Sequence, residues 1–327
     1  MALRNQKWQE EMMVGKKLFV AIACFLWLTT ATYAAPKVVA SIAPLHSLTA
    51  GVMEGIGTPD LLVQGVASPH DYSLRPSDAR KLANADLVFW VGPDLEGFLE
   101  KTLHSNKMAS VTLIDKVTVR LPAREGGVWD EHAHHDHDDH KHDDHKHDDH
   151  HHHHVSIDSH IWLDPINAQS IVTAIEKELI RIDASNAEKY RKNADSLRRD
   201  LAQLDRDLAQ LLAQDGKKPF IVFHDAFQYF EKRYGLSGAG SITVNPEQKP
   251  SAKRLLELRE RVKTSGAHCV FAEPQFDDGL VGSITEGHDV KRATLDPLGA
   301  TGPLGSTAYF SMMRSLADHM HRCLSGT

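Results

Sequence analysis

The sequence lacks three features that would each point to a different class of protein. Basic residues are not in excess, with 37 Lys and Arg against 44 Asp and Glu, so there is no sign of a nucleic-acid surface. Beyond residue 34, no apolar run approaches the roughly 20 residues of a transmembrane helix. An H-E-x-x-H motif is also missing, which argues against a helical zinc-hydrolase site.

The first 34 residues have the pattern of a secretory signal peptide. Lys16 and Lys17 precede an apolar run over 18–28, and small and polar residues follow as far as Ala34. We expect Sec-type export to the periplasm and cleavage after Ala34, because a cut one residue later would place Pro36 beside the scissile bond. The region before the apolar run is long, so three methionines are candidate starts: Met1, Met12 and Met13.

Cysteine is scarce, with 3 in the whole chain. Cys269 and Cys323 remain after removal of residues 1–34. In an oxidising compartment such a pair is most simply interpreted as one disulfide. Two buried free thiols are the alternative.

A histidine-rich tract is the most unusual segment of the chain. Between residues 132 and 154, 13 of 23 residues are histidine and 7 are aspartate. Both residue types bind divalent metals, and the segment is too polar to pack in a core, so we expect a solvated, metal-binding loop over 130–154. An inert spacer or a purification tag is the alternative, but the internal position and interleaved aspartates argue against a tag. The candidate ligands are His132, His134, His135, His137, His140, His142, His145, His147, His150, His151, His152, His153 and His154.

The rest of the chain alternates between strand and helix patterns, which predicts α/β architecture with parallel sheets in two halves. Predicted strands cover 38–42, 61–66, 87–91, 111–114, 220–223, 240–244, 268–271 and 293–295. Predicted helices cover 45–53, 76–83, 95–103, 226–234 and 251–264, with a further helix at the C-terminus.

A long helix is predicted over 185–216, between the two halves. Ser185 and Glu188 have the spacing of a capping box, and Gly216 is a suitable stop. Apolar residues recur every three or four positions, which predicts one buried seam and favours a stiff strut along both lobes over an isolated coiled coil. The seam residues are Tyr190, Ala194, Leu197, Leu201, Leu204, Leu208 and Leu211.

Nine histidines lie outside the tract: His46, His70, His104, His160, His224, His268, His288, His319 and His321. His70 and His224 each follow a predicted strand and precede a helix, one in each half. Ligands of α/β sheets bind in the crevice beyond the carboxyl ends of strands, so these two are placed to share a site. His160 directly follows the acidic tract, and Asp296 follows a strand of the second half.

Six ordered segments carry a resemblance to a known family: SPHDYSLRPSD, DSHIWLDP, FHDAFQYFEKRYGL, NPEQKPSAKRL, FAEPQF and TLDPLG. Together with the tract and the long helix, they resemble the ZnuA-type periplasmic zinc-binding components of bacterial ABC importers over nearly the whole mature chain. The resemblance implies two α/β lobes joined by one rigid helix, with a metal in the cleft between them. The implied partner is an ABC importer permease with its cytoplasmic ATPase.

Carried onto this sequence, the resemblance implies His70, His160 and His224 as metal ligands, with Asp296 or water in fourth place. Three imidazoles and one oxygen ligand suit Zn²⁺. Manganese-binding relatives have Glu where this chain has His224, which favours zinc here. Some zinc-binding members have Glu before the first histidine, but Pro69 occupies that position in this chain.

Carboxylates near these histidines could orient the imidazoles. Asp71 and Asp225 each follow a candidate ligand, although Asp225 could instead cap the next helix. Glu273 follows a predicted strand, and we expect it to have a structural hydrogen-bonding role. Three aromatic residues could line the cleft, with ordinary core packing as the alternative: Tyr72, Trp162 and Phe227.

The predicted function is capture of Zn²⁺ in one tight site and its delivery to the permease, with the tract as an accessory binding or sensing element. We expect a monomer that is not an enzyme and binds no nucleic acid. A periplasmic metal buffer and a receptor for manganese or iron are the alternatives. The predicted division is a signal peptide at 1–34, an N-terminal lobe at 35–184, a connecting helix at 185–216 and a C-terminal lobe at 217–327.

Overall fold

A computed structural model describes residues 34–124, 156–243, 246 and 250–326. Residues 36–327 form one compact unit, distinct from residues 1–35. The predicted signal sequence up to residue 33, the candidate starts and all histidines of the tract lie outside the described residues.

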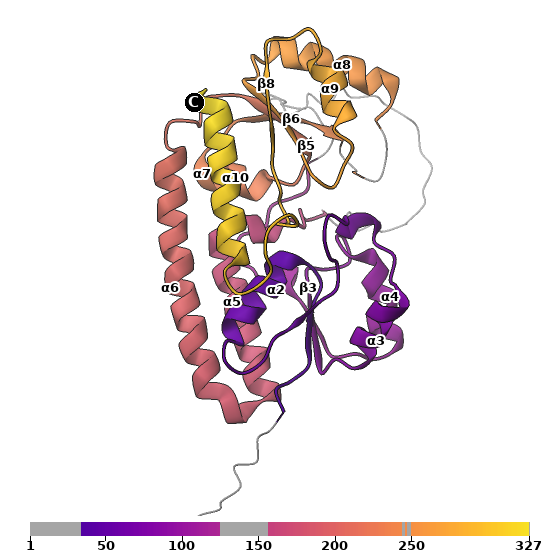
Figure 1. The fold of residues 1–327 in the computed structure, drawn as a ribbon, viewed down its shortest axis with the longest axis vertical. Coiled ribbons are helices and arrows are strands. Elements are labelled where there is room, and N and C mark those ends of the chain that lie inside the picture. Colours follow the sequence, from indigo (N-terminus) through magenta and orange to yellow (C-terminus); the bar gives the residue numbers. More distant parts are fainter. Residues whose placement is uncertain (1–33, 125–155, 244–245, 247–249, 327) are drawn as a thin grey trace, which may run out of the picture. The chain divides into compact units, whose positions relative to one another are not determined.

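The N-terminal half contains a four-stranded parallel sheet with helices on both faces (Figure 1). Its strands are β1 (Val38–Ala40), β2 (Asp60–Leu61), β3 (Leu87–Trp90) and β4 (Ser110–Thr112), in the order β2-β1-β3-β4. Its helices are α2 (Ala43–Val52), α3 (Pro76–Ala83), α4 (Gly97–Ser105) and α5 (Pro165–Ile182). Side chains of α3 and α4 pack on one face, and those of α2 and α5 on the other. Coverage of both faces explains why the central strands β1 and β3 are continuous apolar runs.

The C-terminal half repeats this arrangement. Its strands are β5 (Phe220–His224), β6 (Gly238–Thr243), β7 (Cys269–Ala272) and β8 (Lys291–Thr294), all parallel and ordered β6-β5-β7-β8. Its helices are α7 (Gln228–Tyr234), α8 (Ala252–Thr264), α9 (Gly279–Thr285) and α10 (Ala308–Ser325). Side chains of α8 and α9 cover one face, while α7 and α10 pack against the other. The predicted α/β class with two mainly parallel sheets is therefore confirmed.

Helix α6 (Ala187–Leu212) runs alongside both halves, as Figure 1 shows. It packs against α2 and α5 from the first half and against α7 and α10 from the second. Its 26 residues span about 39 Å at 1.5 Å per residue. One hydrophobic cluster runs from β1 and β3 through the α6 seam to β5 and α10. Because this cluster is shared, movement of one half relative to the other would disrupt packed side chains.

The predicted boundaries of the long helix need correction. A 3₁₀ turn, Ala184–Asn186, precedes α6, and the N-cap residue Asn186 makes no side-chain capping bond. The Ser185 hydroxyl donates to Asp183 Oδ1 at 2.5 Å, so the predicted capping box does not form. The helix ends at Leu212, four residues before Gly216.

Two further differences concern the first half. The strand predicted over 61–66 is shortened to β2, although the amides of Leu62 and Val63 still donate to Ala40 and Ser41 before the turn at Gly65, which has a positive φ of 65°. Helix α5, with 18 residues, was not predicted. It begins at Pro165, with Asp164 accepting from the amide of Ile166, and its apolar face contributes Ile171, Val172 and Ile175 to the shared cluster.

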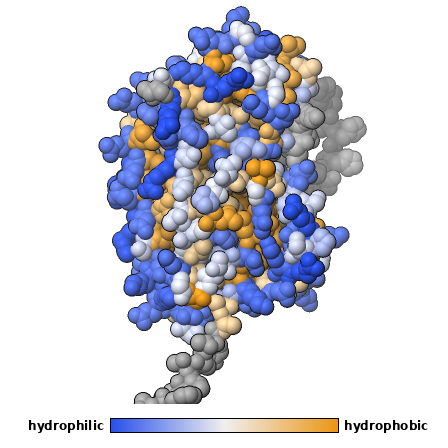
Figure 2. Space-filling model, viewed as in Figure 1, coloured by the Kyte–Doolittle hydropathy of each residue, from blue (hydrophilic) through white to orange (hydrophobic). Residues whose placement is uncertain are grey.

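Within the described residues, no helix is long and apolar enough to cross a bilayer. Polar residues cover most of the face drawn in Figure 2, and apolar residues are gathered mainly toward its middle, with smaller groups near its upper right edge and left side. Large apolar residues that are more than half exposed in the described part are Val66, Leu256 and Leu304.

Glu96, in the turn before α4, is a fully buried carboxyl group with several donors. It accepts hydrogen bonds from the amides of Gly92 at 2.9 Å and Val91 at 3.3 Å, and from the Ser41 hydroxyl. Burial raises the pKa of Glu96 from 4.5 to about 7, although these hydrogen bonds lower it. The turn therefore contains a carboxyl group that stays protonated well above its usual range.

We expect Glu96 to make the folded protein less stable as pH rises. Its stabilising contribution is fully present below about pH 4.5 and is lost as pH rises through about 7. Between pH 5 and pH 8, the unfolding free energy of wild type relative to Glu96→Gln should fall by roughly 2–3 kcal/mol. Denaturant unfolding of both metal-free proteins at the two pH values measures this. A difference that does not change with pH would contradict the assignment.

Candidate metal centre

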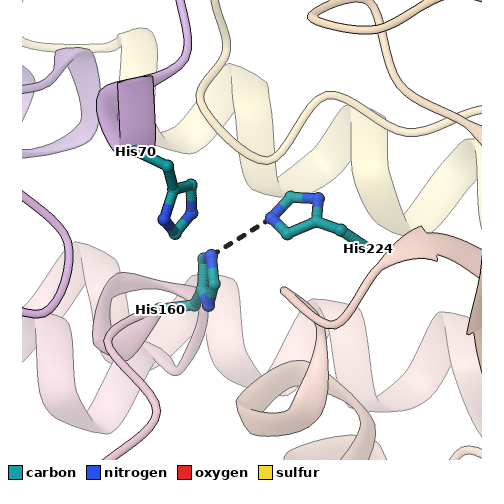
Figure 3. Close-up of side chains that lie close together, drawn as sticks. All are labelled: His70, His160 and His224. Carbon is teal, nitrogen blue, oxygen red and sulfur yellow. Dashed lines mark hydrogen bonds between the residues drawn. The ribbon is translucent and has the colours of Figure 1, made fainter. Parts of the chain in front are cut away.

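Three histidines from distant parts of the chain converge on one point. His70 lies in a 3₁₀ turn, Pro69–Asp71, between β2 and α3, and His160 directly precedes the 3₁₀ turn Ile161–Leu163. His224 is the last residue of β5. One ring nitrogen of each lies within 4.8 Å of the others. Figure 3 shows the three rings pointing toward one another, and the Nε2 atoms of His160 and His224 are 3.2 Å apart.

His160 and His224 are oriented in the same way by buried carboxylates. Asp158 Oδ1 accepts from the His160 amide at 3.0 Å and lies 2.8 Å from Nδ1 of the same residue. Glu273 Oε1 accepts from the His224 amide at 3.1 Å and lies 2.7 Å from its Nδ1. A carboxylate at Nδ1 favours the tautomer protonated there, which leaves the Nε2 lone pair for a metal. Two lone pairs that face each other at this separation suit a shared cation.

His70 is held through its backbone. Its amide donates to the Ser68 hydroxyl at 3.3 Å, and Pro69 starts the turn. Its ring centroid lies 5.5 Å from that of His160 and 5.7 Å from that of His224. Because His70 is positioned by a loop turn and not by a side-chain partner, it is the least constrained of the three.

The protonation of the cluster reflects burial and neighbouring charge. Burial and the nearby imidazoles lower the pKa of His70 from 6.5 to about 2, so its ring is neutral at neutral pH. Burial also lowers the pKa of His224, but the Glu273 carboxylate outweighs it and the net shift is upward. The His70 ring is therefore neutral, whereas the Glu273 carboxylate raises the affinity of His224 for a second proton, which would compete with a bound metal.

The cavity between the three rings is very small, at about 10 Å³. That volume accommodates roughly one water-sized particle. Its walls include Trp162, which is 1% exposed and donates from Nε1 to the Pro297 carbonyl at 2.7 Å. The site therefore has the size of a single ion or water molecule.

Asp296 is not part of the three-histidine group. Its Oδ1 accepts from Gln275 Nε2 at 3.1 Å and from the Leu298 amide at 3.3 Å. Its Oδ2 accepts from the amide and the hydroxyl of Thr301, each at 3.0 Å. All of its acceptor capacity within the described residues is therefore directed to neighbouring loop residues, and its role as a ligand stays a prediction.

The other predicted neighbours have different roles. Asp225 pairs with Arg124 at 3.0 Å, and it neither contacts an imidazole nor caps α7, whose N-cap is Phe227. Arg124 also pairs with the buried Glu231 at 2.6 Å. Asp71 is exposed. The residues Tyr72, Trp162 and Phe227 are all buried.

Asp158 is the site residue that sequence reasoning missed. It lies two residues before His160, and that spacing lets an aspartate accept from the backbone amide two residues ahead. Tyr229 supports the same segment, because its hydroxyl donates to the Asp158 carbonyl at 3.0 Å and accepts from the Leu121 amide at 3.1 Å. Only the folded chain brings Tyr229 to this position.

Cys269 and Cys323 are joined by a disulfide that links β7 to α10. Both cysteines are buried, with 0% and 7% of their surfaces exposed. The bond therefore ties the strand that leads to Glu273 to the C-terminal helix.

Comparisons with known proteins agree with this architecture. Two parallel-sheet lobes along one long helix, with a histidine cluster at the carboxyl end of β5, define the metal-receptor class of solute-binding proteins. Residues 38–323 match the family described as zinc-uptake complex component A, periplasmic (ZnuA). The chain belongs to this family.

Related proteins match over most of their length. The high-affinity zinc uptake system protein ZnuA of Brucella suis biovar 1 is 42% identical over 305 residues, covering 88% of this chain and 91% of the relative. The protein of the same name from Yersinia pestis is 36% identical over 332 residues, covering 98% and 99%.

Solved structures share the fold. A crystal structure of ZnuA has a TM-score of 0.72 and 25% identity, covering 89% of this chain and 99% of that one. A zinc-bound ZnuA lacking residues 138–173 in its own numbering has a TM-score of 0.71 and 25% identity, covering 89% and 98%. The periplasmic zinc-binding protein TroA of Treponema pallidum has a TM-score of 0.72, with 20% identity and coverage of 88% and 99%.

Proposed function

We propose that this chain captures Zn²⁺ in the periplasm and delivers it to the membrane permease of an ABC importer. The observation that carries the proposal is the buried convergence of His70, His160 and His224. Nitrogen ligands around a small cavity suit zinc better than manganese or magnesium, which prefer oxygen. Membership of the zinc-uptake family supports the same conclusion.

The site fits a receptor better than an enzyme. The cavity of about 10 Å³ leaves no space for an ester or peptide beside the ion. The two carboxylates nearest to the imidazoles, Asp158 and Glu273, already face Nδ1 atoms. Neither is placed to act as a general base on a substrate, and the family itself is one of solute-binding receptors.

Further elements of the proposal concern the histidine-rich tract, the N-terminus, the division of the chain and the fourth ligand. The histidines of the 132–154 tract act as an accessory zinc-binding element, and residues 1–34 are removed on export. The mature chain consists of lobes at 35–184 and 217–327 joined through the long helix α6, and it works as a monomer. Asp296 or water remains the fourth ligand that the resemblance implies.

A competitive titration of zinc against manganese tests the proposal. Metal-free mature protein is compared with a variant lacking 132–154. We expect one tight, zinc-selective site per chain in both proteins, with weaker additional binding only in the full mature chain. Loss of the tight site with the tract would overturn the assignment to the three histidines.

Growth distinguishes a receptor from a metal buffer. A strain without this protein should grow poorly when zinc is chelated and recover with the wild-type gene. If the strain were instead impaired only by excess zinc, the protein would be a buffer. N-terminal sequencing of the exported protein checks the predicted cleavage after Ala34.

A further inference from the structure

Gln275 is a polar residue of the metal cavity that no role described so far accounts for. It lies in the loop after β7, between Glu273 and Phe276, and lines the cavity together with the three histidines. Phe276 fixes this loop, because its ring stacks on Phe223 with centroids 4.7 Å apart and meets the His224 ring edge-on at 5.6 Å. The Gln275 side chain is therefore held beside the histidines by packed neighbours.

The orientation of the Gln275 amide follows from its partner. Its Nε2 donates to Asp296 Oδ1 at 3.1 Å. An ionised carboxylate only accepts hydrogen bonds, so the opposite orientation would place two oxygens against each other. Oε1 must then point away from Asp296.

The Gln275 Oε1 atom is buried and has no hydrogen-bond donor among the described residues. A buried acceptor without a partner typically costs about 1–3 kcal/mol. Such a group needs an explanation, and a bound cation is one. Here the unpartnered oxygen belongs to a residue that lines the same cavity as the three imidazoles.

Other oxygens near the site are less suitable. Glu273 also lines the cavity, and its Oε2, like Oδ2 of Asp158, is buried without a hydrogen-bond partner among the described residues. The other oxygen of each carboxylate contacts Nδ1 of its histidine, on the opposite side of each ring from the Nε2 atoms that face each other. A metal about 2 Å beyond Nε2 would therefore lie across the imidazole from these carboxylates. Asp296 does not line the cavity and already accepts from four donors.

We propose that Gln275 Oε1 supplies the oxygen contact to the bound ion that the three histidines leave open. The inference rests on the proposed function and assigns a further residue to the same site. Asp296 then acts through Gln275, because it holds the amide nitrogen and so directs the oxygen to the ion. A neutral amide leaves more of the ion's charge uncompensated than a carboxylate would, which suits a cargo that has to be released.

Two variants of the same residue separate this role from a structural one. Gln275→Leu removes both the oxygen and the nitrogen, whereas Gln275→Glu keeps an oxygen, loses the donor to Asp296 and adds a negative charge. We expect Gln275→Leu to weaken zinc binding 10- to 100-fold. Gln275→Glu should bind zinc at least as tightly as wild type, because the cation offsets its added negative charge.

The measurement is a competition between the mature chain, with its tract intact, and a coloured zinc chelator at one equivalent of zinc. The visible spectrum of the Co²⁺-loaded proteins reports on the ligand set, and it should change in Gln275→Leu. Equal weakening in both variants would mean that only the bond to Asp296 matters, and the proposal would be wrong. A larger loss in Asp296→Asn than in Gln275→Leu would also overturn it.

The same measurements separate failure of the role proposed for Gln275 from failure of the proposed function. If wild type shows no tight zinc site, the proposed function itself fails. If wild type binds zinc tightly and Gln275→Leu binds it equally well, only the role of Gln275 is refuted. Thermal unfolding of the metal-free variants shows whether each one folds.

Discussion

Replacing His224 with alanine should weaken tight zinc binding by more than about 100-fold. Outer residues around a metal typically contribute 10- to 100-fold in affinity, and His224 would be a direct ligand. The substitution removes the Nε2 that lies 3.2 Å from its counterpart in His160. It also leaves the buried Glu273 carboxylate without its imidazole partner. Zinc competition at one equivalent measures the loss.

His104→Ala is the matched control for this experiment. His104 is an exposed residue of α4. The His104→Ala protein should bind zinc as wild type does, because His104 takes no part in the three-histidine group. Comparable affinity of the two variants would refute the assignment of the site. Unfolding curves of both metal-free proteins separate loss of binding from loss of folding.

Removing the disulfide should cost roughly 4 kcal/mol of unfolding free energy. Cys269 and Cys323 are 54 residues apart in sequence. In the chain-entropy model, a closed loop of this length restricts the unfolded chain by about that amount. Denaturant unfolding of Cys269→Ser/Cys323→Ser against the oxidised wild type measures the difference.

The same variant tests whether the disulfide is structural or part of the metal site. Zinc affinity should change little where the double variant is folded, because no sulfur lines the cavity. A stability loss below about 1 kcal/mol would contradict the loop-closure argument. Treatment of wild type with a reductant should reproduce the effect of the double substitution.

Much of the fold follows from local patterns in the sequence. The apolar seam of α6 is buried from Tyr190 to Leu208, as its spacing predicts, because a packed helix has to bury its apolar face. Helix α3 begins and ends at its predicted residues, where Pro76 sets the start. The predicted capping box failed because Ser185 has a closer partner in Asp183, and local rules do not rank such competing partners.

Only part of the candidate site could likewise be predicted from the sequence. The positions of His70 and His224 after strands indicated a shared crevice, and the resemblance added His160. Asp158, Tyr229 and the orientation of Gln275 could not be read from the sequence. Their roles depend on contacts between residues from segments far apart in the chain, or on a turn whose geometry the sequence leaves open.

The sequence by itself determined the α/β class, the long buried helix and the residues available to bind zinc. These properties depend on periodicity and side-chain chemistry, which act over a few neighbouring residues. Tertiary structure decided that one hydrophobic cluster joins both halves and that three imidazoles from distant segments line one cavity of about 10 Å³. Tertiary structure also decided which carboxylate oxygens contact the imidazoles and which accept hydrogen bonds from other residues. These distances are set by the packing of α6 against α2 and α5 of the first half and against α7 and α10 of the second, and no local pattern encodes them.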